Sequence, residues 1–259
     1  LAECVFAPSP DAYLAEPGET ALDCAERAAD GLRDLLERHA GEVCALILEP
    51  RVQCAGGMRM HDPQYLRRAR ELCDAHGVFL IADEIAVGFG RTGTLFACEQ
   101  AGVQPDLLCL SKGLTGGFLP LAAVLCTQAL YDGFLDESRE RAFLHSHSYT
   151  GNPLACAAAL ASLAIFESDG VLSRNRATAA RMTALAAPLA ELPHVADVRQ
   201  AGMILAFELT RGGDMRNAFD PSLRVGLRAY RAALERGVVL RPLGDTLYWM
   251  PPYCIDDAQ

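Results

Sequence analysis

Short apolar runs without polar alternation are the feature that most restricts how this chain can fold. Strands of this kind are buried on both faces, which is typical of parallel sheets whose strands alternate with helices. Helical patterns precede the first two of these runs, at 21–39 and 62–76. The runs themselves lie at 43–48, 78–82, 107–110 and 121–126. The sequence therefore predicts an α/β fold with a mostly parallel sheet and helices on both of its faces.

The pattern changes after a break near residue 168. Beyond this break, short strand-like runs surround one helical segment at 221–236. The runs lie at 195–200, 204–209, 238–241 and 248–250. A length of 259 residues suits one large or two smaller domains. We therefore expect residues 1–168 to form part of a large domain and residues 169–259 a smaller α+β domain.

Composition excludes several classes of protein. The formal net charge of −10 argues against a protein that mainly binds nucleic acid or an anionic membrane. The ten cysteines are scattered without a Cys-x-x-Cys pair, which favours reduced thiols and a cytoplasmic location. The longest apolar stretch, at 153–166, falls short of the roughly 20 residues of a membrane span.

Polar side chains follow three of the predicted strands, and two of them form an informative pair. Asp83 ends the run at 78–82 and Lys112 follows the run at 107–110. In open α/β sheets, ligands bind outside the carboxyl ends of the strands. A partly desolvated lysine there suits Schiff-base chemistry, and a nearby aspartate suits a protonated pyridine nitrogen. The pair therefore fits pyridoxal phosphate, although an ordinary ion pair between strand ends explains the same spacing.

The segment Gly88–Gly93 matches the pattern Gly-x-Gly-x-x-Gly, which makes a dinucleotide-binding fold the main alternative. In that fold the glycines turn directly from strand into helix, and an acidic residue follows about 20 residues later. Here Asp83 and Glu84 precede the glycines, and no clear helix start follows them. A tight loop around Asp83 explains the glycines better.

The roles of four further polar residues stay open. His145 and His147 lack a third ligand at a familiar spacing, so no metal site is predicted. Ser148 lies ahead of a helix that begins at Pro153, where it could serve a phosphate or a helix cap. Arg241 follows a predicted strand and is either a surface charge or a bidentate clamp for a carboxylate.

Three segments in this order resemble class III (fold-type I) pyridoxal phosphate aminotransferases. They read LIADEIAVGFGRTG at 80–93, PDLLCLSKGLTGG at 105–117 and HSHSYTGNPLAC at 145–156. Within that family, residues 49–60 and 240–253 are similar to members that transfer the amino group of S-adenosylmethionine to 8-amino-7-oxononanoate during biotin synthesis. Family members are longer, and their phosphate loop and ring-stacking aromatic residue would precede Leu1. The chain is therefore expected to be a fragment.

The resemblance implies a role for each matching position. Lys112 would hold the cofactor covalently and move the proton, while Asp83 would pair with the pyridinium nitrogen. His147 and Ser148 would contact the cofactor phosphate of a partner subunit, which implies a homodimer with the active site at its interface. It also implies that Ser146 lies beside the substrate.

The same resemblance makes Arg241 the partner of the substrate carboxylate and places Glu49, Gln53 and Arg91 at the pocket wall. The sequence departs from the family at Val87, Arg51, Cys54 and the pair Ser146–His147, where Thr, an apolar residue, Gly and, in some members, Gly-Pro are found. Two alternatives remain beside the biotin enzyme. One is an ω-amino acid:pyruvate aminotransferase of the same class, and the other is a fragment that keeps the fold without catalysing the reaction.

Overall fold

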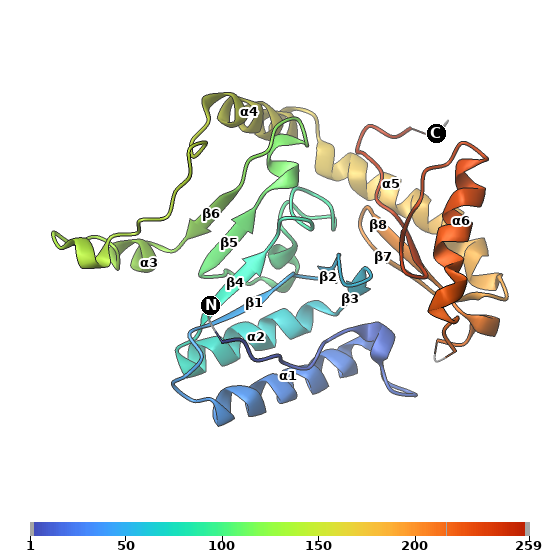
Figure 1. Ribbon diagram of the computed structural model, residues 1–259, viewed down its shortest axis with the longest axis horizontal. Helices are drawn as coiled ribbons and strands as arrows, with labels where there is room; N and C mark the ends of the chain where they lie inside the picture. Colours follow the sequence, from blue (N-terminus) through green and yellow to red (C-terminus); the bar gives the residue numbers. More distant parts are fainter. Residues whose placement is uncertain (1–2, 216, 257–259) are drawn as a thin grey trace.

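The computed structural model describes residues 3–215 and 217–256, and it contains two four-stranded sheets (Figure 1). Leu1, Ala2, Arg216 and the terminal residues 257–259 lie outside the described part. The first sheet has the order β1-β4-β5-β6. Its strands are β1 (Ala45–Leu48), β4 (Phe79–Asp83), β5 (Leu107–Leu110) and β6 (Ala123–Cys126).

The first sheet is mixed. β1, β4 and β5 run parallel, as predicted, but β6 pairs antiparallel with β5. The connection from β5 to β6 spans only residues 111–122 and contains no α-helix. A crossover to a parallel neighbour usually contains an α-helix, and a connection without one returns the chain antiparallel.

Two amphipathic helices, α1 (Ala21–Arg38) and α2 (Pro63–His76), begin and end where the local signals predict. Thr20 and Asp23 form a reciprocal capping box at the start of α1. Asp62 caps α2, and Gly77 ends it in the left-handed conformation with φ 66°. The buried faces of both helices pack together over β1 and β4.

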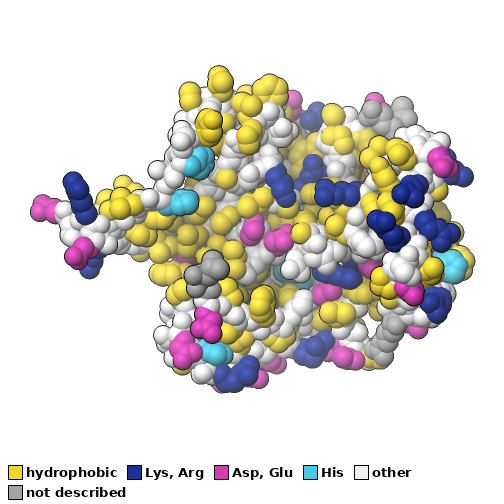
Figure 2. Space-filling view, viewed as in Figure 1, with side chains coloured by type: hydrophobic (Ala, Val, Ile, Leu, Met, Phe, Trp, Pro, Cys, Tyr) yellow, Lys and Arg dark blue, Asp and Glu magenta, His cyan; other side chains and the backbone are white. Residues whose placement is uncertain are grey.

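Helices lie on only one face of this sheet in the described residues, so the prediction of helices on both faces is not confirmed. α1 and α2 cover Leu80 and its neighbours on one face, and α4 (Pro153–Ser168) packs beside Leu110 on that same face. On the opposite face, Ile47 is 61% exposed, and Phe79 and Val124 are also exposed. Hydrophobic side chains cover much of the surface around β4–β6 in Figure 2. An apolar run indicates that a strand is suited to burial on both faces. It does not identify the segment that covers the second face.

The second sheet is antiparallel throughout, with the order β7-β8-β10-β9. Its strands are β7 (Val195–Ala201), β8 (Ile204–Leu209), β9 (Arg241–Leu243) and β10 (Thr246–Trp249). It lies with α5 (Val171–Ala186) and α6 (Val225–Leu234), which confirms the α+β character expected after residue 168. The strand expected at 238–241 is wrong, because β9 begins only at Arg241. The domain boundary itself stays a prediction.

Strand β8 is buried on both faces and joins the two halves of the chain. Leu205 and Phe207 pack toward α5, while Ile204 and Ala206 pack toward the first half. The first half meets them with a short hairpin formed by β2 (Val52–Gln53) and β3 (Arg59–Met60).

A long exposed arm connects strand β6 to helix α4. Residues 127–152 leave the body after β6, form the short helix α3 (Gln128–Asp132) and return to α4 (Figure 1). Among the described helices none is by itself long and apolar enough to span a membrane. α4 and the helical stretch Val171–Glu191 pass that test only together, and they are bent by 74°.

Candidate active site

Three polar residues lie side by side at one edge of the first sheet, where three adjacent strands end. Glu49 follows β1, Asp83 ends β4, and Lys112 follows β5. The register pairs Leu48 with Ala82, so Glu49 and Asp83 lie at neighbouring strand ends. Burial raises the pKa of Glu49, the charge of Asp83 raises it further, and the charge of Lys112 lowers it. The three groups therefore share one electrostatic environment, as the parallel register predicts.

Lys112 lies on a strained turn. Its φ is 42°, in the left-handed region, and it begins the short 3-10 helix η3 (Lys112–Thr115). For a residue with a Cβ this conformation costs about 1–2 kcal/mol. Lys112 is exposed, so the expected partial desolvation is wrong for this structure. The reason is its position on the turn beyond the strand rather than within the sheet.

Asp83 and the next residue, Glu84, point to different environments. The Asp83 carboxylate is half-buried and accepts a hydrogen bond from the amide of Ile85 at 3.1 Å. Glu84 is fully buried, and its carboxylate accepts the amides of Ala97 and Cys98 at 2.6 and 2.8 Å. Burial raises the pKa of Glu84. Glu84 thus anchors the loop that follows Asp83, a role that the sequence reasoning missed because it treated the two acids as one motif.

The glycine segment Gly88–Gly93 lies in this loop and not at a strand-to-helix turn. The next helical element is the 3-10 helix η2 (Ala97–Ala101). A Cβ on Gly88 would lie 2.8 Å from the Glu84 carbonyl oxygen, so the glycine allows the loop to close tightly. The dinucleotide-binding alternative is therefore wrong, because it requires the glycines to open an α-helix.

The unusual residues Arg51 and Cys54 shape the neighbouring loop. Arg51 has φ 69° and donates a hydrogen bond to the carbonyl of His61. Cys54 is 7% exposed, and its amide donates to the Glu49 carboxylate at 3.0 Å. Burial raises the pKa of the Cys54 thiol to about 12. The thiol is therefore protonated at neutral pH, and Cys54 acts there as a small apolar side chain.

Ser146, His147 and Ser148 lie apart from this edge, all exposed on the arm. The His147 amide donates to the Thr150 hydroxyl at 3.1 Å, within the arm. The cap of α4 is Asn152, whose side chain accepts two helix amides, so Ser148 does not cap that helix. In the described ranges no three His, Cys, Asp or Glu side chains gather as a metal site requires.

Arg241 is exposed at the start of β9 and lines an open groove of about 1240 Å³ between α5 and the C-terminal segment. Arg174 and Arg181 of α5 line the same groove. Tyr253 forms part of its wall and also contacts the loop after Asp83, through a 2.6 Å hydrogen bond to the Phe89 carbonyl. The sequence reasoning assigned no role to Tyr253, because an aromatic residue after two prolines carries no chemical signature.

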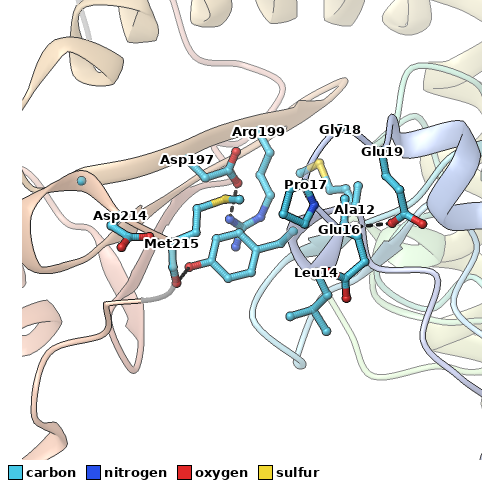
Figure 3. Close-up of a pocket in the computed structure, with 14 residues that line it drawn as sticks. Ala12, Leu14, Glu16, Pro17, Gly18, Glu19, Asp197, Arg199, Asp214 and Met215 are labelled. Atoms are coloured by element: carbon cyan, nitrogen blue, oxygen red, sulfur yellow. Dashed lines mark hydrogen bonds and ion pairs between the residues drawn. The ribbon is translucent and has the colours of Figure 1, made fainter.

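A second groove, of about 980 Å³, lies between the N-terminal loop and the second sheet (Figure 3). Arg199 borders it and pairs with Asp197 at 2.7 Å and with Glu208 at 3.0 Å. The Tyr13 ring lies 4.3 Å from the Arg59 guanidinium, next to this pair. These contacts attach the N-terminal loop to β7 and β8, and the groove contains none of the residues selected from the sequence.

Glu49→Gln is expected to make stability less dependent on pH. Because burial raises the pKa of Glu49 above its ordinary 4.5, the folded state keeps a proton that the unfolded chain releases. The contribution of the protonated Glu49 side chain to the free energy of unfolding is complete below pH 4.5. It is lost as the pH rises through the pKa that Glu49 has in the folded state. The variant cannot ionise, so its free energy of unfolding should exceed that of the wild type increasingly above pH 4.5. Urea unfolding from pH 4 to 8 measures this.

Glu37→Gln is the control for this experiment, because Glu37 is exposed on α1 and its replacement removes the same charge. Parallel pH curves for the wild type and Glu49→Gln would contradict the expectation.

Comparison with known proteins places these features in a family. The family model for aminotransferase class-III matches residues 1–259. The adenosylmethionine-8-amino-7-oxononanoate aminotransferase of Nitratidesulfovibrio vulgaris is 47% identical over all of this chain and 48% of its own length. That of Geobacter sulfurreducens is 48% identical over 97% of this chain and 56% of its own. The chain spans about half the length of these relatives.

Solved structures agree with the fold of the described residues. The adenosylmethionine-8-amino-7-oxononanoate aminotransferase of Methanocaldococcus jannaschii matches with a TM-score of 0.85 and 37% identity, over 89% of this chain and 54% of that one. An omega-aminotransferase from Paracoccus denitrificans matches with a TM-score of 0.89 and 28% identity, over 98% and 57%. Because the family model matches its whole length and curated relatives are 47–48% identical to it, this chain belongs to the class III aminotransferases.

Proposed function

We propose that this chain forms part of a pyridoxal phosphate aminotransferase that transfers the amino group of S-adenosylmethionine to 8-amino-7-oxononanoate, giving 7,8-diaminopelargonate in biotin synthesis. The observation that carries the proposal is the meeting of Lys112 and Asp83 at neighbouring strand ends. Relatives at 47–48% identity, which are adenosylmethionine-8-amino-7-oxononanoate aminotransferases, support this choice of substrates.

The donor set at the strand ends fits the cofactor. A primary amine on Lys112 suits an aldehyde, and a carboxylate on Asp83 suits a protonated ring nitrogen. Asp83 lies on the open face of the sheet, alternating with Leu80 and Ala82 on the helix-covered face. When bound, pyridoxal phosphate supplies an electron sink that stabilises negative charge on the substrate carbon. Lys112 and Asp83 are the residues that would hold it.

The chain's own side chains then perform the proton transfers. Lys112 Nζ is exposed where the strands of the first sheet end. It would take a proton from the substrate carbon and return it to a neighbouring atom. Such transfer by a positioned base contributes about 100- to 10,000-fold in rate. The Asp83 carboxylate would face the ring nitrogen, and the hydrogen bond that it accepts from the Ile85 amide would orient it. Arg241 would orient a substrate carboxylate with its fork of donors.

The exposed arm of this chain would contribute residues to the active site of a partner subunit. Ser146, His147 and Ser148 are exposed and lie on a segment that projects from the body. In a cytoplasmic homodimer this arm would bring the His147 and Ser148 donors to the partner's phosphate and Ser146 to its substrate. Exposed apolar side chains on the arm, such as Phe143 (67%) and Leu144 (86%), suit burial in such an interface.

The amino donor is the part of the proposal that one experiment tests directly. The full-length protein, purified with pyridoxal phosphate, is mixed with S-adenosylmethionine or with alanine, and the visible absorbance of the bound cofactor is followed. We expect S-adenosylmethionine to bleach the absorbance and alanine to leave it unchanged. Bleaching by alanine alone would show an ω-amino acid:pyruvate aminotransferase instead.

A further inference from the structure

The C-terminal segment reaches across the molecule to the loop that follows Asp83. The Tyr253 hydroxyl donates to the Phe89 carbonyl at 2.6 Å, and Arg91 Nη1 donates to the Pro251 carbonyl at 2.6 Å. The Arg91 guanidinium lies 4.3 Å from the centre of the Tyr253 ring. Phe166 of α4 meets that ring edge-on at 6.4 Å. Contacts at both its hydroxyl and its ring therefore hold the Tyr253 side chain in place.

Phe89 connects this contact to the turn that carries Lys112. Its φ of 54° is an outlier for a bulky side chain and persists only where the surroundings hold it. A Cβ on Gly113 would lie 2.7 Å from the Phe89 Cβ, so the Phe89 side chain packs directly on the Gly113 backbone. Gly113 follows Lys112, which also has a positive φ of 42°. The strained residue Phe89 thus packs on the residue that follows the strained residue Lys112.

We propose that Tyr253 is a positioning residue whose hydroxyl, through the Phe89 carbonyl, holds the Phe89 side chain on Gly113 and so fixes the Lys112 turn. The assignment of a purpose to this contact rests on the proposed function of Lys112. The Lys112 turn then adopts its geometry only when the C-terminal segment is docked, which makes the second half of the chain a requirement for the site in the first half.

The chemistry of Tyr253 suits this role. Burial raises the pKa of its phenol to about 12, so the hydroxyl stays a donor through the neutral range. Burial also lowers the pKa of Arg91, whose guanidinium is satisfied by the Pro251 carbonyl and the Tyr253 ring. Tyr253→Phe removes the hydroxyl that donates to the Phe89 carbonyl and keeps both ring contacts, which makes it a narrow test.

The test is hydrogen–deuterium exchange on the full-length protein, comparing the wild type with Tyr253→Phe. We expect exchange to rise about fivefold in peptides covering 86–97 and 111–117, the effect of one lost hydrogen bond. Peptides from α1, at 21–38, should not change. The control is Tyr230→Phe on α6, which removes a phenol from the second half without touching the loop. A parallel assay of amino transfer should show a lower kcat with an unchanged KM for 8-amino-7-oxononanoate.

Several results would overturn the proposal. They are an unchanged peptide 111–117, an equal rise in α1, the same rise in Tyr230→Phe, or a change in KM alone. If the wild type transfers no amino group, the proposed function fails, while the exchange data still decide the coupling. Should Tyr253→Phe not fold, Gly113→Ala tests the coupling from the other end. Its methyl group should raise exchange at 86–97 and at 251–255, and no change at 251–255 would refute the coupling.

Discussion

Lys112→Ala is expected to remove the visible absorbance of bound pyridoxal phosphate from the full-length protein and to lower amino transfer by about 100- to 10,000-fold. The variant loses the amine that would hold the cofactor and the base that would move the proton. Lys112 is the only lysine among the 259 residues, and all the other residues counted as Lys or Arg are arginines. Borohydride reduction in the presence of pyridoxal phosphate, followed by peptide mass spectrometry, should therefore label a single position in this part of the protein.

Lys112→Arg is the matched control, because it keeps a positive charge at the strand end. Arginine stays protonated in proteins and cannot act as the nucleophile or base. We expect Lys112→Arg to be as inactive and as colourless as Lys112→Ala. An active Lys112→Arg variant would show that the position needs only a charge, which is the ordinary ion-pair interpretation of the Asp83–Lys112 spacing.

The placement of Asp83 and Lys112 at neighbouring strand ends was predictable because it follows from strand geometry alone. Apolar runs without polar alternation predict parallel strands, and the carboxyl ends of parallel strands share one edge. The same local logic predicted α2, whose start at Asp62–Pro63 and end at Gly77 depend only on neighbouring residues. These features need no knowledge of distant parts of the chain.

The features that could not be predicted depend on distant contacts. Glu84 adjoins Asp83 in sequence, yet its burial against the amides of Ala97 and Cys98 follows from how the loop folds back. Tyr253 meets Phe89 across 164 positions. The exposed face of the first sheet shows the same limit, since the apolar pattern of β4 does not say which segment covers it. The exposure of Lys112 likewise depends on the turn geometry.

Gly202→Ala is expected to lower the free energy of unfolding by about 2–5 kcal/mol, because two costs combine. Gly202 has φ 56° in the turn between β7 and β8, and an added Cβ would lie 2.5 Å from the Thr92 carbonyl carbon. The neighbouring Met203 amide donates to the Arg91 carbonyl at 2.8 Å. The methyl group would therefore push the second sheet off the loop beside the candidate active site.

Gly237→Ala separates these two costs. Gly237 also has a positive φ, of 78°, but nothing lies within 4 Å of its added Cβ, so only the backbone cost of about 1–2 kcal/mol remains. The difference between the two variants in urea unfolding isolates the contact between Gly202 and the loop. That contact supports the backbone at Arg91, whereas the Tyr253 ring contacts the Arg91 guanidinium. If Gly202→Ala and Gly237→Ala lose the same stability, the second sheet does not support the loop through this turn.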